Sequence, residues 1–204
     1  GKSIEPRDLH GTHFGIICPS DTPEGKKAGL VKNMAFMGFV TIGSDTAPIK
    51  KMVKLLLGDN AKKNYPRSLG WTRVFLNGEP LGETDKPKEL IKTLIKARRN
   101  SDLNAETSIS YFEHIKEIQI AIDHGRLCRP LFVVEDGKML FNVKDAENLN
   151  TGEMSWTELL AKGLVDLIDK AEEETCLIVG YPSDLDELVA TNPERSKLVT
   201  HCEI

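Results

Sequence analysis

Apolar residues in the first 45 positions come in short runs that are separated by glycines and prolines, without helical stripes. Residues 13–18 predict a strand. Residues 30–42 carry almost no charge apart from Lys32, which predicts a strand or short helix buried on both faces. Between them, residues 19–25 predict a tight turn, because two prolines fix φ there and Gly25 can adopt a positive φ.

Further along the chain, the apolar spacing becomes that of a helix and then of a hairpin. Residues 48–57 place apolar side chains at helical spacing after a proline and before a glycine, which predicts a short amphipathic helix. The polar stretch 59–70 predicts a linker. Beyond it, the pair Asn77-Gly78 between two short apolar runs predicts a β-hairpin over residues 72–82.

A second helix is predicted over residues 85–98, with Asp85 as its N-cap and apolar side chains along one face. Its C-terminal end is basic, with Lys96, Arg98 and Arg99 in or next to the last turn. Cations there suit the negative end of the helix dipole without any ligand. We therefore expect these three side chains to be solvated, with contact to another subunit as the alternative.

The C-terminal part of the chain alternates strands with short helices. Ser155 precedes an apolar helical stripe, and Glu158 follows three residues later, which predicts a capping box. The other elements predicted are strands over residues 115–122, 129–134, 165–168, 176–179 and 198–204, and a helix over residues 184–189. The sequence therefore predicts an α+β fold of mixed, mostly antiparallel strands with short helices, in two or three small subdomains.

Composition limits the class of protein. With 204 residues and 40% hydrophobic content, the chain is long enough for one large or two small domains with a real core. It has no apolar run of about 18 residues, and its first residues include no initiator Met, so we expect part of a longer chain that is neither secreted nor membrane-spanning. The net charge of -4 argues against a freestanding nucleic-acid binder, so any such contact must be local or supplied by partners.

The histidines and cysteines complete no known catalytic or metal pattern. The four cysteines are scattered without a CxxC pair, so we expect reduced, buried thiols and no zinc or redox site. His10, His13 and Cys18 lie close in sequence and leave open a small hydrolase with a Cys–His pair. No acidic residue or glycine-framed nucleophile accompanies them, which disfavours that hypothesis.

Two charged runs also fall short of a binding motif. Gly25-Lys26-Lys27 resembles the end of a phosphate loop but lacks its first glycine and its Ser or Thr. The acidic run at residues 172–174 does not have the spacing of a calcium loop, so we expect a solvated acidic face. The sequence thus predicts no metal site in this chain.

The most specific pattern is RDLHGTHFGIICPSDTPEG at residues 7–25, followed by GLVKN at residues 29–33. It resembles the pattern R-x-L-H-x-T-H-W-G-x-x-C-P-x-E-T-P-E-G and G-L-V-K-N in the fork region of second-largest subunits of archaeal and eukaryotic RNA polymerases. Phe14 and Asp21 stand where that pattern has Trp and Glu, so the aromatic and acidic character is retained.

Later segments resemble the same family in the same order. TRVFLNG at residues 72–78 and GRLCRPLFVV at residues 125–134 resemble its external 1 region, residues 156–174 resemble its external 2 signature, and THCEI at residues 200–204 resembles the start of its hybrid-binding domain. The resemblance implies this division: the end of the fork at 1–45, a helix and linker at 46–70, an external 1-like region at 71–150, an external 2-like region at 151–197, and the start of the hybrid-binding domain at 198–204.

In this family the fork lies beside the downstream edge of the transcription bubble, near the active centre. The resemblance implies phosphate contacts by basic side chains, which position nucleic acid without reading its sequence. The candidate nucleic-acid-binding residues are Lys2, Arg7, Lys26, Lys27 and Lys32, of which Arg7 is the strongest because a planar guanidinium suits phosphate. Asp21, Thr22, Pro23, Glu24 and Gly25 are expected to form a rigid turn near the active centre, in which Asp21 organises neighbouring cations.

The resemblance implies no catalytic residue in this chain. The magnesium ion of this enzyme class is held by aspartates of the largest subunit, so we expect an inactive part of a nucleotidyltransferase with no cofactor of its own. The expected partners are the other RNA polymerase subunits, template and nontemplate DNA and the RNA–DNA hybrid, with no membrane. The external regions would serve as scaffold and docking surface. The implied location is cytoplasmic and nucleoid-associated if the source is archaeal, and nuclear if it is eukaryotic.

An independent protein-binding module without nucleic-acid contact is the alternative function. In isolation, apolar side chains of residues 30–42 are expected to become exposed and to cause local disorder, rearrangement or self-association.

Overall fold

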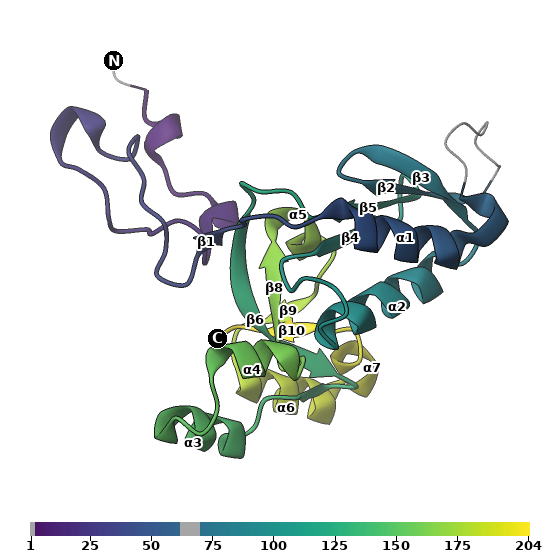
Figure 1. Cartoon of the computed structure of the whole chain (residues 1–204). Coiled ribbons are helices and arrows are strands. Elements are labelled where there is room, and N and C mark those ends of the chain that lie inside the picture. Colours follow the sequence, from purple (N-terminus) through teal and green to yellow (C-terminus); the bar gives the residue numbers. More distant parts are fainter. Residues whose placement is uncertain (1–2, 62–69) are drawn as a thin grey trace.

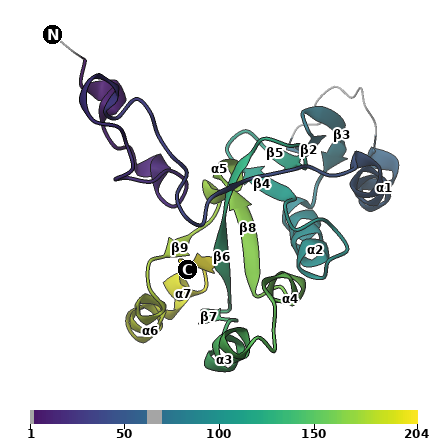
Figure 2. The same cartoon turned by 60° about the vertical axis from the view of Figure 1, so that its left-hand side comes forward.

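A computed structural model describes residues 3–61 and 70–204 of the chain. An N-terminal arm, residues 3–38, projects away from the rest of the molecule (Figures 1 and 2). The remainder is built around two sheets, one of four strands and one of six. Both sheets are mostly antiparallel, with helices between and around the strands, which confirms the α+β prediction. No helix among the described residues has the length and apolarity needed to cross a membrane.

The four-stranded sheet has the order β3-β2-β5-β4. Its strands are β2 (Thr72–Leu76), β3 (Glu79–Thr84), β4 (Ser108–Phe112) and β5 (Glu117–Ala121). The β2–β3 hairpin turns at Asn77 and Gly78, which both have positive φ, of 47° and 79°. This is the turn that an Asn-Gly pair favours, so the hairpin prediction is confirmed. Strand β4 was not predicted, and residues 62–69 of the expected linker lie outside the described residues.

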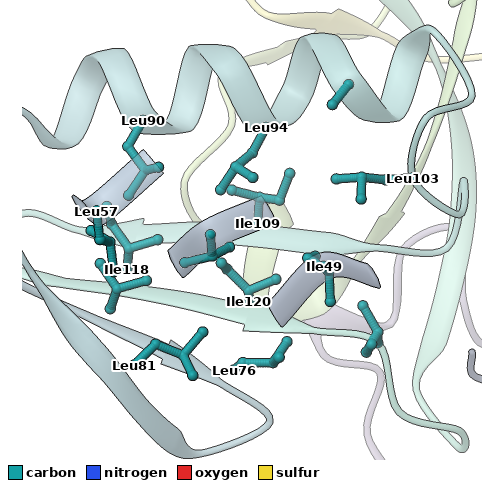
Figure 3. Close-up of a cluster of buried hydrophobic side chains, with 14 residues drawn as sticks. Ile49, Leu57, Leu76, Leu81, Leu90, Leu94, Leu103, Ile109, Ile118 and Ile120 are labelled. Carbon is teal, nitrogen blue, oxygen red and sulfur yellow. The ribbon is translucent and has the colours of Figure 1, made fainter. Parts of the chain in front are cut away.

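Two helices pack against the four-stranded sheet. They are α1 (Thr46–Leu57) and α2 (Pro87–Arg99). Leu94 of α2 is fully buried in one cluster with Ile109, Ile118 and Ile120 of the sheet, and it lies beside Ile109 in Figure 3. Both helices were predicted, but the cap of α2 was wrong. Lys86 takes the N-cap position without a side-chain hydrogen bond, one residue beyond the expected Asp85.

The nine-residue strand β6 is the centre of the six-stranded sheet. It pairs with the strands β1 (Phe39–Val40), β7 (Lys138–Met139), β8 (Val165–Asp169) and β10 (His201–Cys202), and β9 (Ile178–Val179) lies parallel to β10. β6 itself is Leu127–Glu135. The strands expected over residues 176–179 and 198–204 are therefore present but shorter than predicted.

Five helices accompany the six-stranded sheet. They are α3 (Val143–Thr151), α4 (Trp156–Ala161), α5 (Lys170–Glu173), α6 (Pro182–Thr191) and α7 (Pro193–Ser196). The predicted capping box of α4 is confirmed, because Ser155 Oγ accepts from the amide of Glu158 at 3.3 Å and Glu158 Oε2 accepts from the amide of Ser155 at 2.6 Å. Helices α3, α5 and α7 were not predicted.

The arm has little regular structure. It contains the 3₁₀ turns Glu5–Arg7, Gly11–His13 and Gly25–Lys27. The strand expected over residues 13–18 is wrong, since only an isolated bridge joins Ile17 to Met34. The expectation that residues 30–42 are buried on both faces is also wrong. Leu30 is 50% exposed and Phe36 fully exposed, because no described part of the chain covers them.

A buried ion network joins the two sheets; we use this name for Arg98, Arg99, Asp166, Glu172 and His201. Arg98 Nη1 donates to Glu172 Oε2 at 2.8 Å and to the carbonyl of Thr107 at 2.7 Å. Asp166 Oδ2 lies 2.8 Å from Arg99 Nη2, 3.0 Å from His201 Nε2 and 3.4 Å from Arg98 Nη2.

The burial of this network corrects two expectations in part. The Arg98 and Glu172 side chains are 2% and 3% exposed, although the basic helix end and the acidic run were both expected to be solvated, whereas Lys96 and Glu174 are exposed as expected. Each charge is tolerated in the interior because the other neutralises it. Burial alone would raise the pKa of Asp166, but Arg98, the hydrogen bond from His201 and Arg99 together hold that pKa well below its usual range.

We expect Arg98→Met to lower the free energy of unfolding by about 3 to 5 kcal/mol, because it leaves the Glu172 carboxylate buried without its ion pair. Urea unfolding at neutral pH measures this change. Lys96→Met on the exposed side of α2 is the matched control and should alter stability by less than about 0.5 kcal/mol. A loss below about 1 kcal/mol for Arg98→Met would mean that the network contributes little to stability.

The acid dependence of stability should also change in Asp166→Asn. Because the pKa of Asp166 is lowered on folding, its contribution is complete above the unfolded value of about 3.9 and decreases as the pH falls below it. The variant should lose about 3 kcal/mol at neutral pH and show a shallower decline in acid. Urea midpoints across the acid range test this, with the exposed Asp136→Asn as control. Parallel curves for Asp166→Asn and the unsubstituted chain would contradict it.

Candidate nucleic-acid interface

All described candidate residues lie on the arm, which projects away from the two sheets (Figure 2). Lys2 lies outside the described residues. The other candidates are Arg7, Lys26, Lys27 and Lys32, together with the turn at residues 21–25. The arm carries as many acidic as basic side chains, so it has no overall positive charge. Any contact with nucleic acid must come from the local placement of these cations.

Arg7 holds the arm together. Its Nη1 donates to the carbonyl of Lys26 at 2.9 Å and to that of Ala28 at 2.6 Å. These two bonds close the loop that runs from Arg7 to residues 26–28. Gly29 packs against the same residue, since a Cβ there would lie 2.5 Å from the Arg7 carbonyl oxygen, and its φ is +73°. Nε and Nη2 of Arg7 form no hydrogen bond with the part of the chain that the structure describes, so one edge of the guanidinium stays available.

Thr22 organises the turn at residues 21–25. Its hydroxyl donates to the carbonyl of Val31 at 2.9 Å and accepts from the amide of Gly29 at 2.8 Å. Gly25 has a φ of +76°, as its place in the predicted turn requires. The backbone carbonyl of Asp21 accepts from Asn33 at 3.2 Å, while its carboxylate forms no ion pair with the described residues. The expected role of Asp21 in organising cations therefore stays a prediction.

Three lysines of the arm present their charges to solvent. Lys26 and Lys27 belong to the 3₁₀ turn Gly25–Lys27 and are exposed. Lys32 is also exposed, and its Nζ donates to the carbonyl of Gly29 at 2.5 Å. None of the three pairs with a carboxylate in residues 3–61 or 70–204, so each ammonium group is free to meet an anion from outside.

The histidines and cysteines show no catalytic geometry. His10 Nδ1 lies 2.7 Å from Thr12 Oγ1, and Cys18 Sγ lies 3.5 Å from Ser20 Oγ, a hydrogen bond that lowers the pKa of the thiol. No hydrogen bond joins Cys18 to a histidine among the described residues. The four cysteines are free thiols; Cys128 and Cys202 are fully buried and the other two partly. The described residues also contain no group of three or more His, Cys, Asp or Glu side chains that could hold a metal ion.

Sequence reasoning missed the contacts that fix the base of the arm. The Glu106 carboxylate accepts from the amides of Ile42 and Gly43 at 3.0 and 3.4 Å. Further out, the ring of Phe14 lies 5.5 Å from the guanidinium carbon of Arg129. No local sequence pattern predicts these contacts, because the residues in contact are far apart in the sequence and only the tertiary fold brings them together.

Three family models match the chain in consecutive order. The model described as RNA polymerase Rpb2, domain 3, matches residues 1–40, that of domain 4 matches residues 74–135, and that of domain 5 matches residues 156–204. The first match contains every candidate residue of the arm.

Curated relatives match over most or all of the chain. It is 38% identical to the DNA-directed RNA polymerase II subunit 2 of Arabidopsis thaliana and 36% identical to the DNA-directed RNA polymerase II subunit RPB2 of Encephalitozoon cuniculi, in both cases over 100% of the chain and 18% of the relative. It is 34% identical to the DNA-directed RNA polymerase subunit Rpo2 of Sulfolobus acidocaldarius, over 90% of the chain and 17% of that relative. The chain thus spans less than a fifth of the length of these relatives.

Matches to three successive domains of one subunit, and to eukaryotic and archaeal relatives alike, agree with the resemblance found in the sequence. The chain therefore belongs to the family of second-largest subunits of archaeal- and eukaryotic-type DNA-directed RNA polymerases.

Proposed function

We propose that this chain is a noncatalytic part of a DNA-directed RNA polymerase, in which the arm helps to form the fork near the active centre and contacts the downstream edge of the transcription bubble. The observation that carries the proposal is the set of exposed lysines on the arm, Lys26, Lys27 and Lys32, within the stretch that matches domain 3. Unpaired ammonium groups on a projecting element suit the phosphates of a nucleic-acid backbone.

Arg7 has two roles in this proposal. Its Nη1 keeps the loop closed through the carbonyls of Lys26 and Ala28, so it places the two neighbouring lysines. The free edge of its guanidinium is a further phosphate donor. Arg7→Ala would remove both roles together, which makes the lysines the better residues for testing nucleic-acid contact.

The external regions, residues 70–204, act as scaffold and docking surface. The arm also has a protein-binding role, because residues 30–42 expose several large apolar side chains, including Phe36, and exposed apolar side chains favour contact with other polypeptide. The partners are then the other polymerase subunits, along with template and nontemplate DNA and the RNA–DNA hybrid. The reaction of the assembled enzyme is nucleotidyl transfer, and its magnesium ion is held by another subunit. The enzyme is cytoplasmic and nucleoid-associated if the source is an archaeon, and nuclear if the source is a eukaryote.

Fluorescence anisotropy of a labelled DNA bubble with an RNA primer, titrated with this chain at several salt concentrations, tests the nucleic-acid contact. We expect weak, salt-sensitive binding. The triple variant Lys26→Gln/Lys27→Gln/Lys32→Gln should reduce the slope of log affinity against log salt by about 0.7 to 0.9 for each phosphate that the chain no longer neutralises.

The matched control is Lys88→Gln/Lys92→Gln/Lys96→Gln on the exposed side of α2, which changes the net charge equally. An equal reduction of affinity in the two triple variants would mean that only overall charge matters, and would refute the site. If the chain does not bind even at low salt, the arm offers no nucleic-acid surface by itself, and a protein-binding module becomes the better description.

A further inference from the structure

Arg129 of β6 is a charged residue in an almost fully buried position, with 4% exposure. Two carboxylates hold the edges of its guanidinium. Glu203, just after β10, accepts from Nη1 and, at 2.9 Å, from Nη2, and Glu173 of α5 accepts from Nε at 3.2 Å. The planar edge of the group is thereby fixed in one orientation.

The arm rests on the same side chain. The ring of Phe14 lies 5.5 Å from the guanidinium carbon, within the range of a cation–π contact. Gly15 follows it with a φ of +69°, and a Cβ on Gly15 would lie only 2.5 Å from Arg129 Cδ. Lys170 Nζ, which also pairs with Glu173, donates to the carbonyl of Phe14 at 3.4 Å.

Apart from these contacts, the arm has few attachments. Within the described residues, the bond from Lys170 to Phe14 is the one hydrogen bond that joins residues 3–38 to the rest of the chain. The next attachments lie at the base of the arm, where β1 pairs with β6 and Glu106 binds the amides of Ile42 and Gly43. Beyond this short base, the contacts of Phe14 and Gly15 with Arg129 and Lys170 are placed to orient the arm.

We propose that Arg129 is a positioning residue that fixes the orientation of the arm through Phe14 and Gly15, and with it the place of Lys26, Lys27 and Lys32. An arginine is required, because its flat face receives the ring while its edge binds Glu203 and Glu173. A lysine keeps the charge but lacks both the face and the bidentate edge. The role of Arg129 in orienting the arm does not depend on the proposed function. The consequence of that orientation for nucleic-acid binding rests on the proposed function.

Electron-spin distance measurements on this chain test the orientation. Spin labels are attached at Glu24→Cys on the arm and Lys92→Cys on α2, both exposed, in a background of Cys18→Ser and Cys176→Ser with the two buried cysteines retained. Phe14→Leu removes the ring and leaves Arg129 and its carboxylates intact. We expect the population of undocked arm to rise about fivefold, seen as a broader distance distribution.

The matched control is Phe36→Leu, at a fully exposed phenylalanine of the same arm, which should leave the distribution unchanged. Arg129→Lys should broaden it as Phe14→Leu does, and Phe14→Trp should keep it narrow, because Trp is the strongest cation–π partner. Unfolding midpoints of the Phe14 variants confirm that the two sheets stay intact. A distribution that stays narrow in both Phe14→Leu and Arg129→Lys would overturn the proposal.

Bubble binding by the same variants separates this proposal from the proposed function. If Phe14→Leu broadens the distance distribution and also weakens binding while all three lysines are present, both proposals are supported. A different outcome is that Phe14→Leu broadens the distance distribution but leaves bubble binding unchanged, and that the lysine substitutions do not change binding either. In that case the positioning role of Arg129 stands and the nucleic-acid function of the arm fails.

Discussion

The junction of the two sheets depends on the burial of a cation, Arg98. An arginine cannot lose its charge, so its burial requires a carboxylate at contact distance, and the last turn of α2 has none of its own. Glu172 and Asp166 supply the compensating charges from α5 and β8. The four-stranded sheet with its helices and the six-stranded sheet therefore cannot separate without exposing unpaired charge, and their relative placement follows from electrostatics as well as from apolar packing.

Hydrogen bonds of the Asp169 carboxylate connect the buried ion network with the base of the arm. Its carboxylate accepts from Ser108 at 2.9 Å and from Arg126 at 2.8 Å, and Arg126 also donates to the carbonyl of Glu106 at 2.7 Å. The Glu106 side chain then binds the backbone at the base of the arm. The amide of Glu172 also donates to Asp169 at 2.8 Å, so side chains and backbone groups together link the junction of the sheets to the base of the arm by hydrogen bonds.

Local signals in the sequence predicted most of the helices and the hairpin. They failed where the structure depends on contacts between residues that are distant in the sequence. The capping box at Ser155 and the Asn77-Gly78 turn depend only on neighbours, so both could be predicted. Arg98 and Glu172 looked like two solvated charged runs, because nothing local shows that they meet. The candidate lysines came from family resemblance, whereas the loop closure by Arg7 and the contact of Phe14 with Arg129 became visible only in three dimensions.

The central position of β6 has a consequence for synthesis on the ribosome. β6 pairs with β1, made long before it, and with β8 and β10, made long after it. Its buried residues, such as Leu131 and Val133, therefore emerge with one partner strand available and the others still to be translated. During that interval the nascent chain carries an open apolar edge, and residues 201–202 later complete the sheet that residues 39–40 began.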